Sequence, residues 1–268
     1  MAAALALGAC SLVVSTTGLT GGSAPGGPEG GADAASETGS GVDGGLDGGR
    51  DSAADAPTIG PFCESLSPKP TFCADFDERA LTDDFELVNV PAIDTTLSRS
   101  PGRSVVARVE ASATDRYCSL RRSLGITPNA VRILIHVYLD EYDDTRGVEI
   151  ANLRMEKTGG TCSLTASVRG GVWTLDEYCE GPGSPDVNIV HESTRRGVRG
   201  RWTSVSFTAD FTTRKASLVI DGEAAWPEVT LSPNMLKGAA ALYAGLNYVQ
   251  TGSSRVRLHI DDLVIDAQ

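Results

Sequence analysis

The stretch from Thr161 to Glu180 constrains the fold more than any other part of the chain. It consists of two alternating runs that flank Gly170-Gly171, and glycine tolerates the positive φ that a two-residue type I′ turn requires at both positions. Pairing outward from this turn places four pairs on one face: Val168 with Trp173, Ala166 with Leu175, Leu164 with Glu177, and Cys162 with Cys179. The cysteine pair falls at a non-hydrogen-bonded position, where Cα atoms lie about 4.5 Å apart and a disulfide can close. The stretch therefore predicts a disulfide-bonded hairpin in an exported, all-β protein.

The other cysteines predict one further disulfide. Cys63 and Cys73 close a short loop that contains two prolines. Cys118 is left over and is either a buried thiol or a competitor for one of the other four. No pair of cysteines has the Cys-x-x-Cys spacing of a zinc site.

Composition divides the chain into a tail and one domain. Residues 1–57 hold 14 of the 30 glycines, seven acidic residues, one arginine and no aromatic residue, and such a segment cannot bury a core. Residues 58–268 hold all the aromatic residues and have the length of one large sandwich. The total formal charge is −12, so the tail's −6 leaves −6 for the domain. This charge argues against a nucleic-acid partner and against docking on anionic lipid.

The N-terminus predicts a lipid anchor. Met1 to Ala9 is apolar and leads to Leu7-Gly8-Ala9-Cys10, which resembles a bacterial lipobox, although no Lys or Arg precedes it. On this interpretation residues 1–10 are a signal segment, Cys10 carries lipid, and residues 11–57 are a disordered tether of an outer-membrane lipoprotein. The alternative is a chance cysteine in a flexible leader. No run of about 18 apolar residues predicts a transmembrane helix.

Alternating side chains predict about a dozen short antiparallel strands, typical of a sandwich. The expected strands are 71–77, 85–90, 104–110, 117–123, 131–140, 148–156, the two arms of the hairpin, 201–211, 215–221, 240–249 and 255–266. The clearest is 131–140, whose one face is wholly apolar. Residues 186–201 are polar and predict a solvated connection, and 232–237 predict one helical turn.

The order of several landmarks resembles that of the concanavalin A-like, laminin G-like jelly rolls. The landmarks are Phe72-Cys73-Ala74-Asp75-Phe76-Asp77, Trp202 at the start of a strand, the turn Val219-Ile220-Asp221-Gly222, the strand Ala244-Gly245-Leu246, and the closing strand Leu258 to Ile265. The resemblance covers residues 71–266. It implies two packed antiparallel sheets, adjacent first and last strands, and a concave face that binds carbohydrate in many members.

The resemblance also implies a structural calcium, because the adjacent first and last strands bring two acidic pairs together. These are Asp75 with Asp77 and Asp261 with Asp262, and hard cations prefer such oxygen ligands. The alternative is that Asp261 and Asp262 pair with Arg255 or Arg257.

Catalytic motifs are weak. The nearest match to the Glu-x-Asp-x-x-Glu strand of laminarinase-like enzymes begins at Glu141, but its third acid is replaced by Arg146. Asp176, Glu177 and Glu180 are interpreted as a solvated hairpin end. His136, His191 and His259 are interpreted as strand-surface residues, and no dinucleotide loop is present.

We therefore predict a non-catalytic, lectin-like module on the cell envelope. Its candidate glycan-binding residues are Tyr138, Tyr142, Tyr243 and Tyr248, whereas Trp173 and Trp202 are expected in the core. The alternative is a structural or adhesive surface protein with no small ligand, and a polysaccharide hydrolase ranks third.

Overall fold

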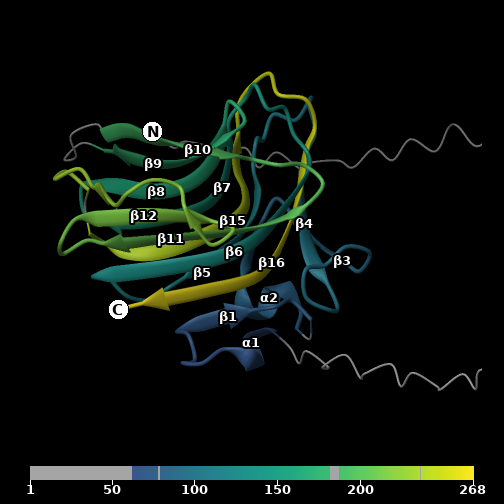
Figure 1. Cartoon of the computed structure of the whole chain (residues 1–268), viewed down its shortest axis with the longest axis horizontal. Coiled ribbons are helices and arrows are strands. Elements are labelled where there is room, and N and C mark those ends of the chain that lie inside the picture. Colours follow the sequence, from purple (N-terminus) through teal and green to yellow (C-terminus); the bar gives the residue numbers. More distant parts are fainter. Residues whose placement is uncertain (1–61, 78, 182–186, 236) are drawn as a thin grey trace, which may run out of the picture. The chain divides into compact units, whose positions relative to one another are not determined.

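Two antiparallel sheets form a sandwich in the computed structural model, which describes residues 62–77, 79–181, 187–235 and 237–268 (Figure 1). The nine-stranded sheet contains β1 (Phe72–Ala74), β3 (Ala92–Asp94), β4 (Ser104–Val109), β6 (Ala130–Glu141), β11 (Trp202–Asp210), β12 (Lys215–Ile220), β13 (Glu223–Ala224), β14 (Val229–Thr230) and β16 (Val256–Ala267). The seven-stranded sheet contains β2 (Glu86–Val88), β5 (Cys118–Ser123), β7 (Val148–Lys157), β8 (Gly160–Arg169), β9 (Val172–Glu180), β10 (Val187–Arg196) and β15 (Ala239–Val249). The predicted all-β, two-sheet fold is confirmed.

The core lies between the two sheets because alternate residues of each strand point inward. On β6, the inward positions Val131, Ile133, Ile135, Val137 and Leu139 are at most 2% exposed. The first and last strands are adjacent as expected, since Phe72 of β1 lies opposite Ile265 of β16. No helix among the described residues is long and apolar enough to cross a membrane.

The central hairpin is β8 and β9, and all four predicted pairs are found in register. Gly170 and Gly171 have φ of 56° and 75°, as a type I′ turn requires. Cys162 and Cys179 are bonded, with Cα atoms 4.1 Å apart. The second predicted disulfide, Cys63–Cys73, is also present.

Cys118 is a buried free thiol that donates to the carbonyl of Asn89, which decides between the two alternatives left open by the sequence. Burial raises the pKa of this thiol. The two disulfides indicate that the domain folds in an oxidising compartment outside the cytoplasm.

Two local predictions are wrong, and some short elements were not predicted. Residues 186–201 contain a strand, β10, and their polarity reflects an edge position, because β10 pairs only with β9 among the described strands. In the segment predicted as one helical turn, residues 233 and 234 form a turn and no described residue is helical, since the Ser232 hydroxyl accepts a hydrogen bond from the Asn234 N–H and competes with helical pairing. Two one-turn helices, α1 (Phe62–Ser65) and α2 (Leu81–Asp84), and the short strands β3, β13 and β14 were not expected. The predicted lipid site and tether lie outside the described residues.

Candidate functional site

A groove of about 530 Å³ crosses the outer face of the seven-stranded sheet. Alternation along β7, β8 and β9 directs apolar residues to the core and polar residues to this face. The groove is lined by Glu149, Asn152, Arg154, Thr161, Ser163, Thr165, Arg169, Asp176, Tyr178, Glu180, Asn188, Asn247 and Tyr248. We refer to this site as the sheet groove.

A row of paired residues runs across the floor of the sheet groove. Tyr243, Asn152, Thr165 and Asp176 occupy neighbouring register positions on β15, β7, β8 and β9. The Asn152 amide nitrogen donates to Thr165 Oγ1 at 2.9 Å. Arg121 Nε donates to the Tyr243 hydroxyl at 3.0 Å and extends the row onto β5. Neighbouring strands therefore hold each polar side chain in place.

Arg169 links two carboxyl groups of the sheet groove. Its Nε and Nη2 each lie 2.8 Å from Oδ2 of Asp176, and its Nη2 lies 3.5 Å from Oε1 of Glu149. The Ser167 hydroxyl also donates to Asp176 Oδ2 at 2.8 Å. Burial raises the pKa of Glu149 to about 7, against the opposing effect of Arg169. Glu149 is therefore partly protonated near neutral pH.

Two tyrosine rings are accessible in the sheet groove. Tyr248 on β15 is 43% exposed and lies opposite Glu149 in the register. Tyr178 on β9 is 45% exposed, and its hydroxyl donates to Glu180 Oε2 at 3.0 Å. Because β7 and β8 separate these strands, the rings are on opposite sides of the floor.

The four tyrosines predicted to bind a glycan do not form one site. Tyr243 and Tyr248 are on the face that carries the sheet groove. Tyr138 is on the outer face of the other sheet, next to the rings of Trp202 and His259. Tyr142 is buried, and its hydroxyl donates to the Gly197 carbonyl at 2.8 Å. Trp173 is in the core as predicted, whereas Trp202 lies opposite Tyr138 in the register and shares its outer face.

The interpretation of Asp176 and Glu177 as a solvated hairpin end is wrong. Asp176 is 5% exposed and belongs to the floor of the sheet groove. Glu177 points to the opposite face, is fully buried, and accepts the Ser232 N–H at 2.8 Å. Its Oε1 also lies 2.7 Å from Nε2 of His191. Sequence alternation separated the two carboxyl groups correctly but did not show what covers them.

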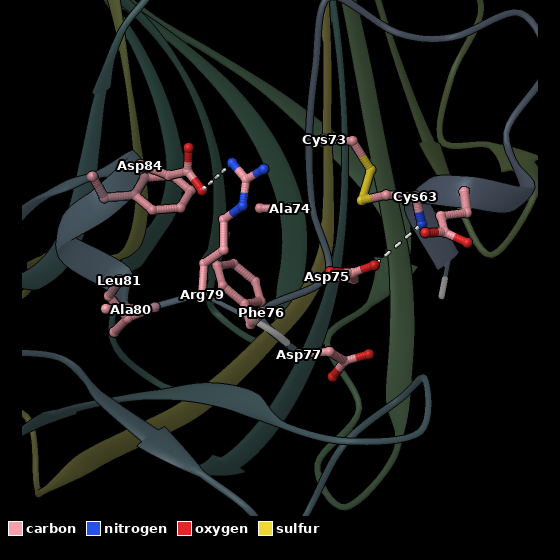
Figure 2. Close-up of a pocket in the computed structure, with 12 residues that line it drawn as sticks. Cys63, Cys73, Ala74, Asp75, Phe76, Asp77, Arg79, Ala80, Leu81 and Asp84 are labelled. Carbon is pink, nitrogen blue, oxygen red and sulfur yellow. Dashed lines mark hydrogen bonds and ion pairs between the residues drawn. A yellow bond between two sulfur atoms is a disulfide. The ribbon is translucent and has the colours of Figure 1, made fainter. Parts of the chain in front are cut away.

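A second pocket, of about 200 Å³, lies beside the Cys63–Cys73 disulfide (Figure 2). Figure 2 shows Asp75 accepting a hydrogen bond from the Cys63 N–H, and Arg79 paired with Asp84. Asp77 also lines this pocket and accepts the Arg103 N–H at 2.9 Å. Burial, together with the charges of Asp75 and Asp262, raises the pKa of Asp77. The first and last strands thus bring acidic residues into one region.

Asp261 and Asp262 do not pair with Arg255 or Arg257, whose partners are Glu141 and, for Arg257, also Asp140. Asp261 instead accepts the N–H groups of Arg99, Ser100 and Asp262. Burial, followed by the charge of Asp262, raises the pKa of Asp261 to about 7.

Asp262 accepts the Ser100 hydroxyl at 2.9 Å and lies 3.2 Å from His136 Nδ1. No group of three or more His, Cys, Asp or Glu side chains in the described part of the chain has the arrangement of a metal site. Calcium binding by these four acids stays a prediction, which thermal unfolding with calcium and with a chelator can test.

The remaining catalytic candidates do not converge. Glu141 pairs with Arg255, and Asp143 accepts the Thr145 N–H and hydroxyl in a turn. The three histidines are not free surface residues, because each contacts a different carboxylate: His136 contacts Asp262, His191 contacts Glu177, and His259 contacts Asp94.

Comparison with solved structures shows what fold this is. The chain is similar to the cellulose-induced protein Cip1, with a TM-score of 0.56 and 13% identity over 74% of this chain and 97% of Cip1. It is also similar to the alginate lyase vAL-1 from Chlorella virus, with a TM-score of 0.50 and 9% identity over 70% of this chain and 95% of the lyase. The domain has a concanavalin A-like jelly-roll fold. No protein-family model and no curated protein sequence matches the chain.

Proposed function

We propose that this domain binds a polysaccharide in the sheet groove. The observation that carries the proposal is the pair of half-exposed rings, Tyr178 and Tyr248, on either side of a polar floor. Sugar rings present an apolar face and a hydroxyl edge, so they fit an aromatic ring next to fixed polar groups. The alginate lyase with the same fold acts on a polysaccharide, which is consistent with this choice of ligand class.

The test is a pull-down with insoluble polysaccharides that compares single tyrosine variants of the full chain. Tyr178→Ala and Tyr248→Ala should each lower the bound fraction. Tyr117→Ala is the matched control, because Tyr117 is 40% exposed but does not line the sheet groove. Binding that all three variants retain equally, or binding by none of the proteins, would refute the proposal.

A second candidate function is hydrolysis of the bound polysaccharide, and Glu149 is the observation that favours it. A general acid must be protonated near neutral pH, as a carboxyl group with a pKa of about 7 is. Asp176, held in its ion pair with Arg169, supplies a second carboxyl group in the same groove. New reducing ends released by the wild type but not by Glu149→Gln would support hydrolysis. A bound polysaccharide that releases none from either protein would contradict it.

We also propose that the domain is attached to the cell envelope through lipid on Cys10, which fits the disulfides of an exported protein. Metabolic labelling with a fatty acid should mark the native protein and not Cys10→Ser. Equal labelling of both would contradict the anchor.

A further inference from the structure

The floor of the sheet groove has hydrogen-bond acceptors that no described residue satisfies. Asn152 Oδ1, Asp176 Oδ1 and Asn247 Oδ1 are buried and have no hydrogen-bond partner among the described residues. All three residues line the sheet groove, and Asp176 is 5% exposed. A buried acceptor without a donor costs free energy, so a ligand that supplies donors here gains more than one that does not.

The other end of each of these side chains is already bonded, which fixes where the open oxygens of Asn247 and Asp176 point. The Asn152 amide nitrogen donates to Thr165 Oγ1 at 2.9 Å, and the Asn247 amide nitrogen donates to the Tyr243 carbonyl at 3.1 Å. Oδ2 of Asp176 accepts hydrogen bonds from the Ser167 hydroxyl and from Arg169 Nε. Rotation of the Asn247 amide would turn its oxygen toward the Tyr243 carbonyl, which only accepts, and would break the bond. The Thr165 hydroxyl can both donate and accept, so the Asn152 amide keeps one hydrogen bond to it in either orientation.

The cationic side chains of the sheet groove already have acidic partners. Arg169 contacts Asp176 and Glu149, and Arg154 lies 3.3 Å from Glu156. Above the pKa of Glu149, the lining carries three carboxylates, on Glu149, Asp176 and Glu180, and two guanidinium groups. Its formal charge is then −1, on a chain of formal charge −12. Arg154 Nε has no hydrogen-bond partner among the described residues, so an anionic polymer meets this open guanidinium nitrogen but a lining of net negative charge.

We propose that the sheet groove selects an uncharged, hydroxyl-rich glycan and discriminates against polyuronates such as alginate. Hydroxyl groups donate to Asn152, Asp176 and Asn247 without adding negative charge, whereas each carboxylate of a polyuronate adds an acceptor and a charge. The inference rests on the proposed polysaccharide binding and differs from the substrate of the alginate lyase that shares the fold.

Native affinity electrophoresis of the full chain tests the inference at pH 8, where Glu149 is ionised. The gels contain one soluble polysaccharide each: a mixed-linkage glucan, a xylan, a galactomannan, alginate or polygalacturonate. At least one of the three neutral polymers should retard the protein, and the two polyuronates should not. Retardation by a polyuronate as strong as that by any neutral polymer overturns the charge selection and leaves the proposed function standing. If none of the five polysaccharides retards the protein, both the charge selection and the proposed polysaccharide binding are overturned.

Two variants test whether the open acceptors make the contact. Asn152→Leu and Asn247→Leu keep a similar volume and remove the acceptor, and each should weaken retardation by the neutral polymer by at least about tenfold in apparent Kd. Thr208→Val, on the outer face of the other sheet, is the matched control and should bind as the wild type does. Melting temperatures identify any variant that fails to fold. Folded Asn152→Leu and Asn247→Leu proteins that bind as the wild type does would overturn the role of these oxygens.

Discussion

Oε1 of Glu149 lies 3.5 Å from Nη2 of Arg169, and yet the pKa of this carboxyl group is raised to about 7 instead of lowered. Loss of solvation on the floor of the sheet groove outweighs the attraction of a guanidinium group that is itself 43% exposed. The ion pair with Arg169 is therefore too weak for the ionised form of Glu149 to stabilise the folded state. The consequence can be measured as a dependence of stability on pH.

Glu149→Gln should raise the free energy of unfolding at pH 8 and change it little at pH 4. Between the ordinary pKa of 4.5 and the folded pKa of about 7, the folded state holds more protons than the unfolded state, so stability falls as pH rises through this window. One pKa unit corresponds to about 1.4 kcal/mol, which sets an upper limit of about 3 kcal/mol on the gain at pH 8. Urea unfolding at both pH values measures it.

Glu156→Gln is the matched control for this comparison, because Glu156 is also on β7 and also pairs with an arginine but is 57% exposed. It should change stability by less than about 0.5 kcal/mol at either pH. A Glu149→Gln protein that is equally stable or less stable than the wild type at pH 8 would contradict the raised pKa.

Glu177 should contribute strongly to stability, because it is fully buried and connects β9 to Ser232 and His191. Glu177→Ala leaves the Ser232 N–H without its acceptor and should lower the free energy of unfolding by about 2–5 kcal/mol. Glu177→Gln keeps an acceptor oxygen and the volume, and should cost less than half as much. Equal losses for the two variants in urea unfolding would show that the hydrogen bonds do not account for the effect.

The Cys162–Cys179 disulfide closes a loop with a sequence separation of 17. On the chain-entropy model, removing such a cross-link lowers the free energy of unfolding by about 3 kcal/mol. Urea unfolding of Cys162→Ala/Cys179→Ala in comparison with the wild type measures this loss. Adding a reductant to the double variant controls for Cys63–Cys73. A loss below about 1 kcal/mol would mean that the pairing of β8 with β9 holds the hairpin without the disulfide.

The hairpin and the sheets could be predicted because their signals are local. Gly170-Gly171 determines the turn, period-two alternation determines which side chains share a face, and together they place Cys162 opposite Cys179. The outward polar positions of β7, β8 and β9 follow from the same alternation. Asn152 and Asp176 could therefore have been named as residues of one face.

What the sequence did not show is which faces become covered and which groups meet across the sheets. Glu177 is acidic and follows a hairpin turn, but the 231–235 segment, 55 residues further along the chain, buries it. Tyr142 carries an aromatic ring of the kind that can contact a sugar, but Arg199 and Gly197 pack over it. Such contacts depend on loop paths that no local pattern specifies.

Ser100 provides a test of how the buried carboxylates of β16 are held. Asp262 is 1% exposed, and its Oδ1 accepts the Ser100 hydroxyl at 2.9 Å. Ser100→Ala removes this donor and leaves a buried carboxylate oxygen without it, so the free energy of unfolding should fall by about 1–3 kcal/mol. Ser206→Ala, on the outer face of β11, is the control and should stay within about 0.5 kcal/mol of the wild type. Equal stability of Ser100→Ala and Ser206→Ala in urea unfolding would show that His136, 3.2 Å from Oδ2, is sufficient to hold Asp262.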